Sequence, residues 1–314
     1  MIRYCANLLF QLPITLLGLF TVIFIILRII PGDPVASYLG EMASREALES
    51  MRISFGLDKP LFMQYLGNLS GMLTGDFGRS FVSGRPVIEE IMAVLPNTLI
   101  LALAALVVSS LLGMAAGVLA ALRINRLTDY LVMIFSTLGV SIPVFWLGYM
   151  LILGFSYKLD LFPVAGVTTQ PSLLAQIHAL VLPSLSLALL FMSVVARMTR
   201  SSMAEVLNSD FIRTVRAKGA SETLVIVKHA LRNAMIPIVT VIGINSGLLI
   251  AGAVLVETVF ARPGVGKLLV DSVMSSDYPV VQGVVLLVGA ACVLANMTVD
   301  LLYATLDPRI KLGG

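Results

Sequence analysis

Long, nearly uninterrupted blocks of apolar residues dominate the chain, and shorter polar segments separate them. Blocks of about 18 or more apolar residues with few charges are typical of helices that cross a bilayer. The first block has 22 residues, or about 33 Å as a helix, which is enough to cross the hydrocarbon layer. The pattern predicts an all-α polytopic membrane protein with six transmembrane helices, at Leu9–Ile30, Asn97–Leu122, Leu131–Tyr157, Leu180–Val195, Ala234–Val256 and Val280–Ala304.

Composition supports this interpretation. Of the 314 residues, 58% are hydrophobic and only 12% are charged, whereas a soluble protein carries about a quarter charged residues. The net charge of +3 does not indicate a surface for nucleic acid. Cys5 and Cys292 lie far apart in apolar surroundings, and we expect both to be buried small residues. His178 and His229 are also far apart, so we expect no metal site and no cofactor bound by this chain.

The distribution of basic residues predicts the orientation. In one alternating set of short segments there are 12 Lys and Arg residues, against 3 in the short segments of the other set. Because basic residues collect on the cytoplasmic side, both termini are expected in the cytoplasm. The cytoplasmic set comprises residues 1–8, 123–130, 196–233 and 305–314.

This orientation divides the chain into consecutive parts. They are a cytoplasmic N-terminus with the first helix (1–30), a periplasmic segment (31–96), a transmembrane core (97–304) and a cytoplasmic tail (305–314). The core contains a cytoplasmic hairpin (196–233) between the fourth and fifth helices, and a periplasmic loop (257–279). Segment 31–96 is expected to form two short amphipathic helices, broken at Gly56–Pro60, as a periplasmic cap on the membrane domain.

The stretch ARPGVGKLL at 261–269 has some of the residues of a phosphate-binding loop. That loop needs a Gly five residues before Gly266 and a Ser or Thr after Lys267, but Ala261 and Leu268 stand there. We therefore expect a turn that leads into a short helix dipping towards the membrane.

Small residues recur every four positions in the second predicted helix. Ser109, Gly113, Gly117 and Ala121 share one helix face, where they would let another helix approach closely. That neighbour could belong to this chain or to a partner subunit, and a contact with substrate is the alternative. Asp300, inside the sixth predicted helix, is expected to make a hydrogen bond or salt bridge between helices.

Proline and glycine inside the predicted helices indicate bends, at Gly139, Pro143, Gly243 and Gly247. In lipid, a bend is tolerated where neighbours or a cavity satisfy the backbone. Polar residues beside these bends are candidates for lining a translocation pathway, namely Ser136, Ser141, Asn245 and Ser246.

The hairpin at 196–233 combines apolar and basic residues. A helix capped by Ser209 or Asp210 is expected, with Phe211 and Val215 on one face, and Gly219 is expected to end it in a left-handed conformation. Ser221 can cap a second helix with Glu222 in its first turn, and Leu224, Val227 and Leu231 form an apolar stripe on it.

Two interpretations of the hairpin are open: docking into a groove on a partner, or attraction to anionic lipid. A glycine between two capped helices favours docking. The candidate residues are Asp210, Phe211, Arg213, Val215, Arg216, Lys218, Gly219, Ser221, Glu222 and Leu224.

Motifs along nearly the whole chain resemble the first permease subunit of bacterial ATP-binding-cassette importers for dipeptides, oligopeptides, glutathione and nickel. These motifs are IIPGDP (29–34), FGLDKPLFMQY (55–65), GDFGRS (75–80), RMTRSSMAEVL (197–207), DFIRTVRAKGASE (210–222), HALRNAMIP (229–237), VETVFARPGVGKLLVDSV (256–273), DYPVVQ (277–282) and LDPRI (306–310).

The resemblance implies a type I importer permease fold in which the hairpin couples the chain to an ATPase. It implies as partners a second homologous permease subunit, two ATPase subunits that bind ATP and Mg²⁺, and a substrate-binding protein at the outer face. The wider superfamily begins its hairpin motif with Glu-Ala-Ala ahead of the glycine that Gly219 matches. Here Arg213, Thr214 and Val215 take those three places.

The resemblance leaves the substrate open among dipeptides, oligopeptides, glutathione, nickel and metal chelates. The absence of a His or Cys set favours a peptide or a chelate. Two other classes fit less well. An intramembrane enzyme needs a nucleophile with a base, or paired acids, at membrane depth, and an ion-coupled carrier favours inverted repeats and buried ionisable pairs.

Overall fold

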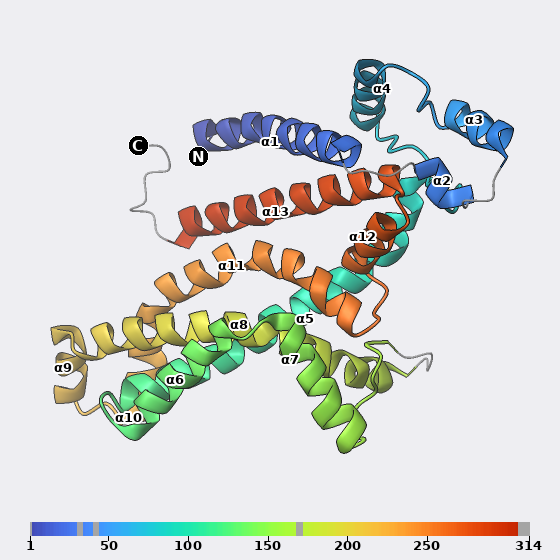
Figure 1. Ribbon diagram of the computed structural model, residues 1–314. Coiled ribbons are helices and arrows are strands. Elements are labelled where there is room, and N and C mark those ends of the chain that lie inside the picture. Colours follow the sequence, from blue (N-terminus) through green and yellow to red (C-terminus); the bar gives the residue numbers. More distant parts are fainter. Residues whose placement is uncertain (1, 30–33, 40–43, 168–171, 307–314) are drawn as a thin grey trace. The chain divides into compact units, whose positions relative to one another are not determined.

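The computed structural model describes residues 2–29, 34–39, 44–167 and 172–306 (Figure 1). Among these residues every regular element is a helix. The helices are α1 (Ile2–Ile29), α2 (Pro34–Leu39), α3 (Arg45–Ser54), α4 (Leu61–Leu73), α5 (Val87–Leu122), α6 (Leu127–Ser141), α7 (Val144–Leu151), η1 (Ile152–Lys158), α8 (Leu173–Leu207), α9 (Asp210–Ala217), α10 (Glu222–Leu224), η2 (Val225–Leu231), α11 (Arg232–Val259), α12 (Val265–Met274) and α13 (Tyr278–Leu306).

Several of these helices are long and apolar enough to cross a membrane. Five continuous stretches qualify in the described residues, and the pair α6 and α7–η1 qualifies as a broken sixth. The prediction of an all-α, multi-pass membrane protein is therefore confirmed. The five stretches are Gln11–Ile29, Val87–Leu122, Leu173–Leu207, Glu222–Val259 and Tyr278–Ala295.

The third predicted span, Leu131–Tyr157, is formed by two helices that meet at a sharp break. α6 ends at Ser141, α7 begins at Val144, and the two helices meet at 106°. Ile142 is extended, with φ −85° and ψ 126°, because the residue before a proline is pushed out of the helical region by the ring of Pro143. The bend expected near Pro143 is thus a sharp break, whereas α11 continues as one helix through Gly243 and Gly247.

The chain divides into two compact units. The hairpin unit contains Leu99–Arg262 and the chain from Leu294 onward, and the N-terminal unit contains Ile2–Thr98 and Pro263–Val293. Each is described by itself below.

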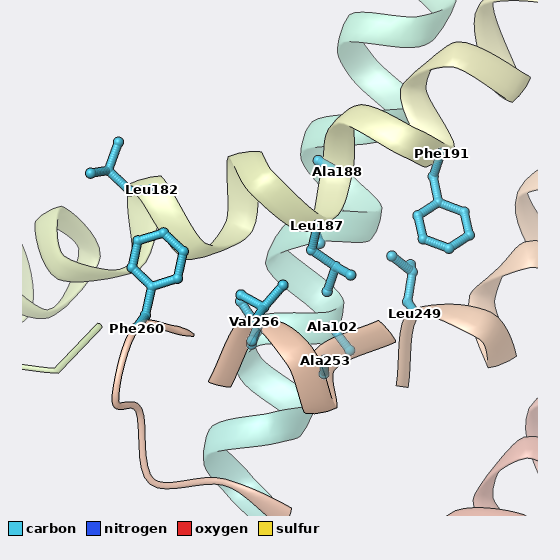
Figure 2. Close-up of a cluster of buried hydrophobic side chains, with 11 residues drawn as sticks. Ala102, Leu182, Leu187, Ala188, Phe191, Leu249, Ala253, Val256 and Phe260 are labelled. Atoms are coloured by element: carbon cyan, nitrogen blue, oxygen red, sulfur yellow. The ribbon is translucent and has the colours of Figure 1, made fainter. Parts of the chain in front are cut away.

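In the hairpin unit, α5, α8 and α11 enclose a core that Figure 2 shows in close-up. Leu187 and Phe191 of α8 lie beside Leu249, Ala253 and Val256 of α11, and Ala102 and Ala105 of α5 complete the cluster. The small residues on α5 allow a close approach to α8. A Cβ added at Gly117 would lie 2.5 Å from both the Ala196 oxygen and the Thr199 Cβ. The small-residue face of α5 is therefore a packing face within this chain.

In the N-terminal unit, the C-terminal end of α1 packs beside the N-terminal end of α13. Leu27 of α1 packs with Tyr278 and Val281 of α13. Further from these two ends, Phe20 and Phe24 of α1 pack with Leu286 of α13. Asp277, just before α13, holds the 80–83 loop: its carboxylate accepts hydrogen bonds from the Ser80 hydroxyl and from the Phe81 nitrogen at 3.0 Å.

Candidate functional site

The hairpin is a short helix, a glycine turn and a second helix. α9 ends at Ala217, and Gly219 follows with φ +84°, a left-handed conformation that glycine adopts without strain. The Gly219 nitrogen donates to the Arg216 oxygen at 2.9 Å, which closes the C-terminus of α9. The glycine turn thus lies where the sequence predicts it.

The second helix of the hairpin is not a separate element. α10, the π-helical stretch η2 and α11 form one continuous helix, Glu222–Val259, which runs through Pro237. The chain therefore passes from the hairpin into the fifth predicted transmembrane helix without a break.

The hairpin is anchored by residues that sequence reasoning missed. Ile212 of α9 and Val225 and Ala230 of η2 are fully buried in a cluster with Met203 of α8 and Ala234 of α11. A signal was present, because Ile212 and Val215 are three residues apart on one helix face, and Val215 packs against this cluster.

The apolar stripe predicted on the second helix is divided in the structure between exposed and packed residues. Leu224 and Val227 are 41% and 59% exposed, and Phe211 of α9 is 50% exposed, whereas Leu231 packs against the buried cluster. The prediction assumed α-helical spacing, but η2 is a π-helix with more residues per turn, which rotates the faces. The hairpin therefore presents apolar side chains on its surface.

Polar contacts hold the two arms of the hairpin together. Arg216 of α9 donates to both carboxylate oxygens of Glu222 in α10, at 2.8 and 3.3 Å. Arg213 pairs with Asp210 within α9, at 3.2 Å. Lys218 is exposed beside the turn.

The predicted side-chain caps are not formed. Ser209 and Ser221 occupy the N-cap positions, but neither side chain accepts from a helix amide, and Ser209 donates instead to the Val206 oxygen at 2.7 Å.

An ion pair near the hairpin was not predicted. Asp129 at the start of α6 is buried, and its two carboxylate oxygens accept from Nε and Nη2 of Arg200 on α8, the latter at 2.7 Å. The Asn125 nitrogen also donates to this carboxylate, at 3.0 Å. No sequence pattern links two residues 71 positions apart.

The candidate pathway residues lie on two helices that both pack against α8. Ser136 and Ser141 belong to α6, and Asn245 and Ser246 belong to α11. Ser141 donates to the Thr137 oxygen, Asn245 to the Val241 oxygen and Ser246 to the Gly243 oxygen, each within its own helix. The structure does not bring the four around one described cavity, and their role stays a prediction. The side chain of Asp300 lies outside the described residues.

At the other end of α11, the ARPGVGKLL stretch forms a turn followed by α12, as expected. Arg262 is buried and donates to the Gly166 oxygen, and the Gly166 nitrogen donates to the Phe260 oxygen at 2.8 Å. Burial lowers the pKa of Arg262, and the charge of Glu257 opposes that shift. The turn is thus fixed to the loop after η1, and its role here is structural.

Comparison with known proteins gives the family. The model of the binding-protein-dependent transport system inner membrane component matches residues 113–312, and the model of its N-terminal part matches residues 1–102. The chain is 42% identical over 311 residues to the glutathione transport system permease protein GsiC of Escherichia coli strain K12, with 99% of both chains covered.

Two further relatives are named for peptides. The di/tripeptide transport system permease protein DppB of Pseudomonas aeruginosa is 41% identical over 333 residues, with 99% of each chain covered. The dipeptide permease DppB of Alkalihalophilus pseudofirmus is 39% identical, covering 99% of this chain and all of the relative. Both family models and the full-length relatives agree with the helical architecture, and the chain therefore belongs to the binding-protein-dependent transport system inner membrane component family, the permease subunits of ABC importers.

Proposed function

We propose that this permease forms half of a transmembrane pathway for short peptides or glutathione, and that a second homologous permease subunit forms the other half. The observation that carries the proposal is identity of about two residues in five, over the full length, to permeases named for glutathione and for di- and tripeptides. These solutes share peptide bonds and free carboxylates. Nickel and metal chelates remain the alternative from the wider family.

In this proposal the hairpin is the contact with an ATPase subunit. Its buried residues, Ile212 and Val225, fix it to α8 and α11, while Phe211, Leu224 and Val227 are exposed. Exposed apolar side chains beside Arg213 and Lys218 suit a groove on a protein partner. ATP and Mg²⁺ would bind to the two ATPase subunits, and a substrate-binding protein would deliver the solute at the opposite face.

The proposed orientation follows from the basic residues of the hairpin and of the other short segments in its set. It places the hairpin and both termini in the cytoplasm. The C-terminal ends of α1 and α11, just after Arg28 and Glu257, then lie at the outer face. Alternating access then requires that closure of the ATPases favours one of two arrangements of the helices.

Replacing Gly219 tests the coupling role. Gly219→Pro removes the hydrogen bond to the Arg216 oxygen and forces φ to negative values, so we expect transport to be lost while the chain still inserts into the membrane. Gly219→Asn is the matched control, because asparagine tolerates the left-handed conformation. Substrate-stimulated ATPase activity and peptide uptake are measured in proteoliposomes of the complete importer. Normal stimulation in the proline variant would overturn the coupling role.

A further inference from the structure

The helix α4 lies in the segment predicted to be a periplasmic cap, yet it has no charged residue. Residues 60–75 are uncharged throughout, and Lys59 and Asp76 flank them. By contrast, α3 just before it contains Arg45, Glu46, Glu49 and Arg52. A surface helix in water normally carries charged or polar residues on its outer face.

The first face of α4 contacts α1 at a level inside the membrane span. Tyr65, Leu69 and Met72, spaced four and three residues apart, pack in the cluster of Phe20 and Phe24. The Tyr65 hydroxyl is 2.9 Å from the Thr21 hydroxyl. Thr21 precedes Ile29, the end of the span, by eight residues, which is about 12 Å along the helix axis. α4 therefore packs on α1 at the depth of the acyl chains.

The second face of α4, which also includes Met63, lines a cavity of about 570 Å³ within the N-terminal unit. Gln64, Gly67, Asn68 and Gly71 belong to this face. Gln64 accepts from Arg28 at 3.1 Å and donates to the Lys59 oxygen at 2.8 Å. Gln64 is thus bonded within the protein, whereas Asn68 and Ser70 are exposed.

The third face is apolar and exposed. Phe62, Leu66 and Leu73 follow helical spacing and are 70%, 46% and 83% exposed. α1, on which α4 packs, also exposes apolar side chains, Val22 and Ile25 among them. An uncharged helix that packs on a membrane-spanning helix and exposes an apolar face has the polarity of a membrane protein, not of a soluble cap.

Three hydrogen bonds near the C-terminal end of α4 are made within the chain. The Ser70 hydroxyl donates to the Gly67 oxygen and the Thr74 hydroxyl to the Gly71 oxygen, both at 2.8 Å. The Asp76 nitrogen also donates to the Gly71 oxygen, at 2.8 Å. Hydrocarbon offers no partner for such groups, so satisfaction within the chain is required there.

We propose that α4 lies in the lipid of one leaflet, with Phe62, Leu66 and Leu73 against acyl chains. Its 13 residues span about 20 Å, too little to cross the hydrocarbon, so the chain enters and leaves the bilayer on the same side. This is the side at the C-terminal end of α1. It is the outer leaflet in the proposed orientation, and only the name of the leaflet rests on that proposal.

Spin labels test this placement. Leu66→Cys and Leu73→Cys are made in an importer whose other cysteines, Cys5 and Cys292 included, are replaced. The labelled complex with its partner subunits is reconstituted in phospholipid nanodiscs. Collision rates with oxygen, which concentrates in hydrocarbon, and with a water-soluble nickel chelate are compared. Val22→Cys on α1 is the lipid control, and Ser50→Cys on the exposed side of α3 is the water control.

We expect both α4 labels to collide more with oxygen than with the nickel chelate, as Val22→Cys does, and Ser50→Cys to show the reverse. More collisions with the nickel chelate at Leu66 and Leu73 would place α4 in water and overturn the proposal. Low collision with both reagents would mean that a protein subunit covers the face, which also overturns it. The collision rates require no transport, so this test fails or succeeds independently of the proposed function.

Discussion

Arg200 and Asp129 form a two-point ion pair that holds the start of α6 against α8. Two nitrogens of the guanidinium meet two oxygens of the carboxylate, in the side-by-side geometry that gives arginine its strongest pairs. Asp129 has 3% of its side chain exposed and Arg200 has 27%, so the carboxylate depends on its partner more than the guanidinium does.

Arg200→Met should therefore destabilise the protein more than Asp129→Asn. Removing one partner of a fully buried pair costs about 3 to 5 kcal/mol. Because Arg200 is partly exposed and solvent screens the pair, we expect about 2 kcal/mol for Arg200→Met and less for Asp129→Asn. The double variant should be more stable than Arg200→Met alone. Thermal unfolding of the purified complex measures these differences.

The matched control for that pair is Arg213→Met, which removes the exposed pair with Asp210 and should leave the unfolding temperature unchanged. Equal unfolding temperatures for Arg200→Met and the wild type would contradict the role of the pair.

Gly117→Val should force α5 away from α8. The new side chain meets the backbone of Ala196 and the Cβ of Thr199, neither of which can move without shifting α8. We expect a loss of about 1 to 3 kcal/mol in stability, the usual cost of overpacking. Gly18→Val is the control, since no atom lies within 4 Å of a Cβ there. A lower unfolding temperature for the control than for Gly117→Val would contradict this packing.

Val227→Asp should weaken assembly with the ATPase without unfolding the chain. The side chain is 59% exposed, so a carboxylate there remains in water in the free subunit and would be desolvated only in a complex. We expect the ATPase to be lost on co-purification while the amount of permease in the membrane stays normal.

Leu161→Asp is the matched change, in the exposed loop before α8, and the ATPase should be retained there. Retention of the ATPase by Val227→Asp would exclude this face from the contact.

Asp277→Ala should release the 80–83 loop. The carboxylate accepts from the Ser80 hydroxyl and from the Phe81 and Val82 nitrogens, the latter at 3.3 Å, and alanine provides no acceptor. Hydrogen–deuterium exchange of a peptide covering this loop should become faster. Asp271→Ala, which removes only an exposed pair with Lys267, should leave exchange in the loop unchanged. Unchanged exchange in Asp277→Ala would show that other contacts fix the loop.

The membrane helices and the glycine turn could be predicted because their signals are local. Apolar length predicts a span, and Gly219 among helix-forming residues predicts a left-handed turn. The sharpness of the break at Ile142 could not be predicted, because a proline such as Pro143 can either bend a helix or end it. That outcome depends on whether neighbouring helices satisfy the freed backbone groups.

The contacts of the hairpin were harder to predict. A π-helical stretch changes which residues share a face, and no residue pattern announced η2. The pair of Asp129 and Arg200 joins helices that are far apart in sequence. The sequence of α4 does not show which of its residues line a cavity. In each case the tertiary neighbour, and not the local sequence, decides the outcome.

The continuous helix from Glu222 to Val259 has a mechanical consequence. It measures about 57 Å if straight and carries the exposed hairpin surface at one end. The helix also contains the π-helical stretch η2 and Pro237, two of the features at which helices bend. In the proposed assembly, a displacement of the hairpin would therefore enter the membrane along this one helix, and η2 and Pro237 would set how much of it reaches the far end.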